Sequence, residues 1–102
     1  MADEDKPILT TIKEAKMAIG ILTLLSQKRE KFGEDKTWLY ISETIRALKD
    51  FPAMTIRSFL EKLEENKVIE FIPPPEWGGV FRYTKSGEQR IKKELSELSI
   101  KS

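Results

Sequence analysis

The sequence predicts a small α+β domain that is mostly helical and carries a short antiparallel β-hairpin. Apolar residues recur at helical spacing near both ends of the chain and in its middle, which indicates amphipathic helices. Two β-rich segments, "VIEFI" and "VFRYT", flank the loop "PPPEWGG", and this arrangement is typical of a hairpin. A length of 102 residues fits one domain with a single modest core.

The composition narrows the classes of function. The chain has no Cys and no His, which excludes disulfides, Cys/His zinc sites and both Ser-His-Asp and Cys-His catalysis. It also has no glycine-rich phosphate loop, so we expect no enzyme activity, no metal and no cofactor. Its 18 basic and 17 acidic residues give a net charge of +1, so any affinity for DNA must come from the local placement of charges.

The start of the chain, "MADEDKPIL", is acidic, whereas a signal peptide begins with basic residues. The longest apolar run, "MAIGILTLL", is shorter than the ~20 residues that span a bilayer. We therefore expect a soluble, cytoplasmic protein that does not contact membranes. Residues 1–7 are expected to form a disordered acidic tail, and residues 8–102 a single domain.

The first helix is expected at about residues 11–31. Thr10 or Thr11 can cap its start, and Glu14 lies three residues after Thr11, where it completes a capping box. The segment "KFGEDK" ends the helix at Gly33.

This helix is apolar nearly all round, whereas a surface helix should have one apolar and one polar face. One face consists of Ile12, Ala15, Ile19 and Leu22, and the other apolar residues spread around the remainder. We interpret the two-sided pattern as one face toward the core and one toward a second copy of the chain; the alternative is a central helix wrapped by its own domain. The expected homodimer interface, which includes the last helix, consists of Met17, Ile21, Leu24, Leu25, Leu95 and Leu98.

The middle of the chain predicts a strand and two helices. "TWLYI" is β-branched and aromatic and suits a strand at about 37–41. Ser42 can cap a helix at about 42–50, which ends before Pro52 because the residue that precedes a proline avoids helical geometry. A further helix is expected at about 53–66. Its inward face consists of Ile56, Phe59, Leu60 and Leu63.

The hairpin and the last helix follow. Strands are expected at about 68–72 and 80–84, and either Asn66 or Lys67 must make the turn that leads into the first of them. Thr84 can cap a helix at about 85–98. Its apolar stripe consists of Ile91, Leu95 and Leu98.

Two motifs in this order resemble a known family. "TIRSFLEKLEENKVI" and "VFRYTKSGEQRI" are similar to the third helix and to the wing and following helix of winged helix-turn-helix domains in MarR- and PadR-like transcription regulators. The resemblance covers about 38–98. It implies a winged helix-turn-helix fold with a small antiparallel β-wing, a long N-terminal helix and a C-terminal helix. It also implies a homodimer that binds double-stranded DNA at a palindromic, sequence-specific site.

The chain departs from the family pattern in two places. Lys67 stands where the family usually has Gly, and the tip of the wing, "PPPEWGG", has no basic residue. The near-zero net charge and this wing favour an alternative function, a winged-helix protein-interaction module in a larger assembly.

The resemblance places the helix at 53–66 in the role of a recognition helix, whose early turns meet base edges. Arg57 is assigned to a guanine edge or a phosphate, Lys62 to a phosphate, and Glu61 to cytosine N4 or to an ion pair with Arg57. The full set of expected DNA-binding residues is Ser42, Thr55, Arg57, Ser58, Glu61, Lys62, Arg82 and Lys85.

Simpler interpretations of these residues remain open. The exposed charges can form a solvated helix face, Ser42 is explained as a cap alone, and Arg82 can pair across the sheet. Trp77, in the loop between the two strands, either packs back on the sheet or forms an exposed contact for a protein partner.

Overall fold

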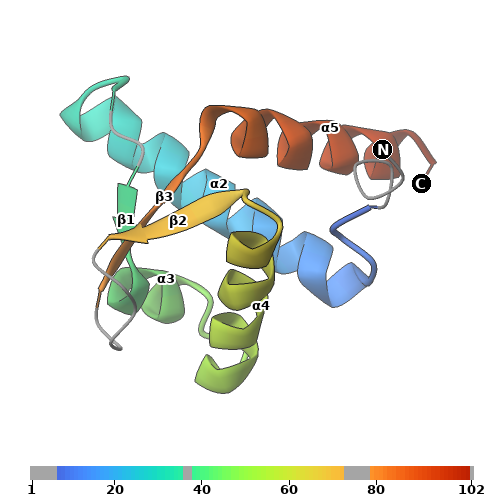
Figure 1. The fold of residues 1–102 in the computed structure, drawn as a ribbon, viewed down its shortest axis with the longest axis horizontal. Coiled ribbons are helices and arrows are strands. Elements are labelled where there is room, and N and C mark those ends of the chain that lie inside the picture. The colour runs from blue at the N-terminus through green and yellow to red at the C-terminus, as the bar shows by residue number, and fades with distance from the viewer. Residues whose placement is uncertain (1–6, 36–37, 73–78, 102) are drawn as a thin grey trace.

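The computed structural model describes residues 7–35, 38–72 and 79–101, and the side chains among them up to residue 98. Four helices and three strands follow one another in this part of the chain (Figure 1). In chain order they are α2 (Ile12–Phe32), β1 (Trp38–Tyr40), α3 (Ile41–Ala47), α4 (Ala53–Glu65), β2 (Ile69–Ile72), β3 (Val80–Tyr83) and α5 (Lys85–Lys101). The expected acidic tail lies almost entirely outside the described residues.

The three strands form one small antiparallel sheet in the order β1-β3-β2. Arg82 on β3 lies between Trp38 of β1 and Glu70 of β2. The expected hairpin is therefore present as β2 and β3, and β1 adds a third strand to it. A mostly helical α+β fold with a small antiparallel sheet is confirmed.

The helices enclose a single core. In Figure 1, α5 lies above α2 and runs in the opposite direction, while α3 and α4 lie below α2. The fully buried side chains come from every element. The largest of them are Phe81, Ile8, Met17, Ile21, Leu25, Leu39, Ile41, Ile56, Leu60, Leu63, Ile69 and Ile91.

The start of α2 is fixed by two hydroxyl residues and one carboxylate. Thr11 is the N-cap, and its Oγ1 accepts a hydrogen bond from the backbone N–H of Glu14 at 3.0 Å. The Glu14 carboxylate turns back to Thr10, from which it accepts hydrogen bonds from both the backbone N–H and the hydroxyl at 2.9 Å. The capping box differs from the predicted one, because Glu14 accepts from the backbone N–H of Thr10 and not from that of the N-cap, Thr11.

The segment before α2 is tied to α5, which the sequence does not indicate. Ile8 and Leu9 are buried in the core. Their backbone N–H groups donate to the carboxylate of Glu94 on α5 at 2.9–3.0 Å. This one side chain therefore holds the incoming chain against the last helix.

The expected cap of α3 is wrong. The helix begins at Ile41, one residue earlier than predicted, so Ser42 lies inside the first turn and its side chain is exposed. Glu43 satisfies the helix start instead, because its carboxylate accepts a hydrogen bond from the backbone N–H of Tyr40 at 2.8 Å. Ser42 therefore does not cap this helix.

Lys67 makes the turn between α4 and β2. Its φ of 62° lies in the left-handed region, while Asn66 before it has a φ of −92°. A left-handed residue with a side chain costs roughly 1–2 kcal/mol, more than glycine loses in backbone entropy. We expect Lys67→Gly to raise the free energy of unfolding by up to about 1 kcal/mol in urea titrations.

The neighbouring residue is the matched control. Asn66→Gly should lower the free energy of unfolding, because it adds backbone freedom without relieving strain and removes the bond from the Asn66 side chain to the carbonyl of Lys62. If both glycine variants were destabilising, the turn would not be strained at Lys67.

The start of α5 depends on Thr84 and Gly87. The Thr84 hydroxyl accepts a hydrogen bond from the Gly87 N–H at 3.0 Å and donates to the carbonyl of Lys67 at 2.9 Å. A Cβ on Gly87 would lie 2.4 Å from the backbone of Val68, so only glycine fits this contact. The predicted Thr84 cap is confirmed.

Candidate nucleic-acid interface

The outer face of α4 is exposed along its whole length. Ile56, Phe59, Leu60 and Leu63 are buried, as the sequence predicts. The opposite stripe consists of Met54, Ser58, Glu61 and Glu65, all exposed. The first turns of this stripe are neutral and the last turns are acidic, so only the early part suits a phosphate backbone.

Two expected contact residues lie at the edges of this face. Thr55 and Arg57 are both half-buried. The Nε of Arg57 is buried and the side chain interacts within its own chain, so its guanidinium is partly covered by protein. Glu61, which the sequence offers as an ion-pair partner of Arg57, is exposed, whereas Arg57 is half-buried.

The predicted role of Lys62 as a phosphate contact is not supported by its surroundings. Its ammonium group donates to the Glu14 carboxylate at 2.9 Å, and it lies on the side of α4 that faces the start of α2. Burial works against ionisation of Glu14, but hydrogen bonds from Thr10 and Lys62 outweigh it and lower the pKa of this carboxyl. Lys62 therefore links two helices of its own chain.

Arg82 is likewise engaged within the sheet. Its Nε donates to the carboxylate of Glu70 at 2.7 Å, directly across the β2–β3 pair. This is the simpler of the two interpretations that the sequence left open. Both side chains are about half exposed, so solvent screens the pair and its contribution to stability is small.

The remaining expected residues lie at the surface. Ser42 on α3 and Lys85 at the start of α5 are exposed. Trp77 lies outside the described residues. The sequence reasoning missed two exposed cations, Arg46 on α3 and Lys49 in the turn that follows, which precede α4 closely in the chain. The signal available in the sequence was their place on either side of Leu48, an inward-facing residue of the predicted helix.

The expected dimer interface on α2 is largely wrong. Met17, Ile21 and Leu25 are at most 2% exposed and belong to the core of their own chain. The face that the sequence assigned to the interior contains the exposed side chains instead. Ile12 is 77% exposed and Ile19 is 53% exposed. The two-sided apolar character of α2 is therefore present, with the inner and outer faces exchanged.

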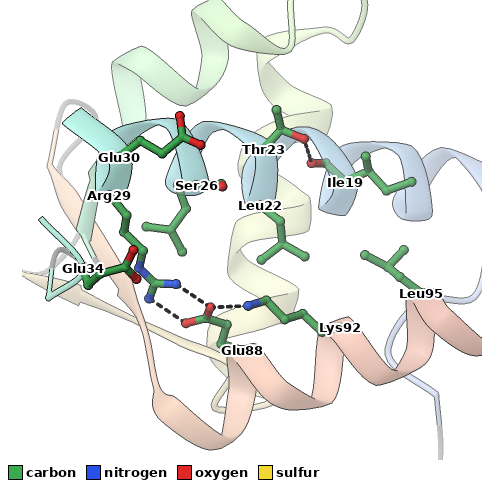
Figure 2. A pocket seen from close by; sticks show the side chains of 11 residues that line it. Ile19, Leu22, Thr23, Ser26, Arg29, Glu30, Glu34, Glu88, Lys92 and Leu95 are labelled. Carbon is green, nitrogen blue, oxygen red and sulfur yellow. Dashed lines mark hydrogen bonds and ion pairs between the residues drawn. The ribbon is translucent and has the colours of Figure 1, made fainter. Parts of the chain in front are cut away.

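A groove of about 510 Å³ lies between α2 and α5 (Figure 2). Ile19 and Leu22 of α2 and Leu95 of α5 line one end. The other expected interface residues are less deeply buried than Met17, Ile21 and Leu25. Leu24 and Leu95 are half-buried against the core. Leu98 is 43% exposed, because no described residue covers the end of α5. The last helix thus keeps both of its expected interface residues near the surface.

An ion-pair cluster closes the other end of the groove. Glu88 accepts two hydrogen bonds from Arg29, at 2.7 and 2.8 Å, and pairs with Lys92 at 2.9 Å (Figure 2). The hydrogen bonds from Arg29 outweigh burial and lower the pKa of Glu88 to about 2. The same contacts raise the pKa of Arg29. This cluster fastens α5 to the far end of α2.

In the part of the chain that the structure describes, no helix has the length and apolar character needed to cross a membrane. Comparison with known proteins leaves the geometry as the main guide to function. No protein-family model, no curated protein and no solved structure matches this chain.

Proposed function

We propose that the chain is a winged helix-turn-helix domain that binds double-stranded DNA as a homodimeric transcription regulator. The observation that carries the proposal is the arrangement of α3, α4 and the β2–β3 hairpin. Helix α4 follows α3 after a short turn and runs in a different direction (Figure 1). One of its faces is exposed along its length. A reading helix needs an exposed face of this kind in the major groove.

The early turns of α4 are the best candidates for base contacts. Met54 and Ser58 are exposed there, with Thr55 and Arg57 at the edges. The methyl groups of Met54 and Thr55 suit a thymine methyl, and the hydroxyls and guanidinium suit base edges or phosphates. The acidic residues Glu61 and Glu65 lie farther along, where a recognition helix leaves the groove.

The cations near α4 limit the number of phosphate contacts. Because Lys62 and Arg82 form ion pairs in their own chain, the candidates become the exposed residues Arg46, Lys49 and Lys85 and the half-buried Arg57. Four contacts per subunit would neutralise about eight phosphates in a dimer. We expect log affinity to fall with log salt concentration with a slope no steeper than about −7, at −0.9 per phosphate.

The test is a titration of duplexes that the protein enriches from a random pool, at several salt concentrations. Arg57→Ala should weaken binding to the enriched site by about 1–3 kcal/mol if the guanidinium contacts a guanine edge. Lys93→Ala is the control, because it removes one exposed positive charge from α5, on the opposite side of the molecule (Figure 1). Circular dichroism of both variants checks that the fold is retained.

The proposal would be wrong if neither the wild type nor Arg57→Ala bound any duplex at low salt. A second candidate, a winged-helix protein-interaction module, would then take its place. The acidic second half of the α4 face, with Glu61 and Glu65 exposed, favours this candidate, because it repels phosphates and suits a basic protein surface.

A further inference from the structure

The outer face of α2 is a long surface that no other residue described in the structure covers. It consists of exposed side chains at helical spacing along five turns: Ile12, Lys16, Ile19, Thr23, Ser26 and Glu30. Beside it lie the groove residues Leu22 and Leu95, and the exposed Leu98 at the end of α5. Ile12 and Ile19 lie two turns apart on this face, and both are exposed apolar side chains that a partner can bury.

The charges on this face change sign along the helix. Lys16 lies near its start and Glu30 lies near its end, and both are exposed. Lys16 and Glu30 form no ion pair with any residue that the structure describes. A face that is basic at one end and acidic at the other is complementary to a copy of itself turned end to end.

We propose that a second copy of the chain covers this face, with α2 packed antiparallel against the partner's α2 around a two-fold axis near Thr23. Antiparallel pairing about this position puts Lys16 opposite the partner's Glu30 and, by symmetry, Glu30 opposite the partner's Lys16. Ile19 then lies opposite the partner's Gln27, next to the partner's Ser26.

The residues at the centre of the face suit a close approach of two helices. Thr23 and Ser26 have small side chains, so the helix axes can approach to the short end of the usual 8–10 Å range. The Thr23 hydroxyl already donates to the carbonyl of Ile19 at 2.8 Å, so burial at an interface leaves no unpaired donor (Figure 2). By symmetry the apolar contacts then lie on both sides of the axis, at Ile19 and at the partner's Ile19.

Charge exchange tests the register. The wild-type chain should have twice its chain mass of 11.8 kDa by light scattering at micromolar concentration. Lys16→Glu and Glu30→Lys should each raise the dissociation constant of the dimer by about tenfold, because each creates two repulsive contacts by symmetry. The double variant Lys16→Glu/Glu30→Lys should restore wild-type association. A monomeric wild type, or a double variant no better than the single ones, would overturn the proposal.

Crosslinking tests the position of the axis. Because the chain has no cysteine, Thr23→Cys introduces a single thiol that meets its symmetry mate only if the axis lies there. Mild oxidation should convert this variant to a disulfide-linked dimer. Ser58→Cys, equally exposed on α4, should remain monomeric on a non-reducing gel. Equal crosslinking of the two variants would contradict the antiparallel α2 interface.

This inference deepens the proposed function, because a two-fold dimer presents two copies of α4 to a palindromic site. The two can fail separately. A dimer that forms the expected crosslink but binds no duplex would support the α2 interface and contradict the DNA-binding proposal. A monomer that binds duplex DNA would support DNA binding and contradict the α2 interface.

Discussion

Leu63→Ala should lower the free energy of unfolding by about 2–5 kcal/mol, because it removes buried methyl groups and leaves a cavity. Leu63 is fully buried in the middle of the core face of α4. Its backbone carbonyl also accepts the hydrogen bond from Val68 that leads the chain into the sheet. For a domain of this size the loss corresponds to a fall in melting temperature of at least about 8 °C.

The matched control for this substitution is on the same helix. Met54→Ala truncates a large side chain that is 72% exposed, so its effect should stay within about 0.5 kcal/mol. Thermal and urea unfolding of the two variants measure the difference. An unchanged melting temperature for Leu63→Ala would show that the helical phase of α4 is wrong.

Glu88→Gln should cost about 3 kcal/mol of stability at neutral pH, since a pKa of about 2 lies well below the ordinary value of 4.5. The substitution keeps the shape of the side chain but removes the charge that binds Arg29 and Lys92. A carboxylate with a lowered pKa stabilises the folded state above its unfolded pKa. That contribution should therefore be present above about pH 4.5 and should be lost as the pH falls toward 2.

Urea unfolding of wild type and variant between pH 2 and pH 7 measures this effect. The difference in stability between the two should be constant above about pH 5 and should shrink steadily in acid. Glu97→Gln, an exposed carboxylate on the same helix, is the control and should show a small difference. A difference between wild type and Glu88→Gln that did not change with pH would mean that the ion pair does not lower the pKa of Glu88.

The sequence predicts the elements well where one physical signal dominates. Ile56, Phe59, Leu60 and Leu63 share a single helical face, so the type and phase of α4 follow directly. The three prolines and two glycines between the last two strands separate them without ambiguity. The cap at Thr84 follows from the chemistry of helix starts, which is local in sequence.

The orientation of α2 could not be predicted because both of its faces are apolar. Ile12 and Ile19 on one side and Met17 and Ile21 on the other are equally acceptable core residues by composition. The choice depends on which side α3, α4 and the sheet occupy. Leu48, for example, packs against the small Gly20 and fixes how closely α3 approaches α2.

The candidate interface was predicted less well than the fold, because its charges are paired by long-range contacts. Lys62 and Glu14 are 48 residues apart, and no local pattern connects them. A cation on an outward position of a helix therefore looks available from the sequence even where the fold provides a carboxylate. The pair of Arg82 and Glu70 could be predicted from the sequence, because the two residues face each other across a hairpin.

The contact between Glu94 and the first described residues bears on the order of folding. The bond from the Ile8 N–H to Glu94 joins residues 86 positions apart. Closing so long a loop costs conformational entropy that few contacts offset before the helices and sheet have assembled. The entry segment is therefore expected to dock late in folding and to leave early in unfolding, so its contacts slow unfolding without speeding folding.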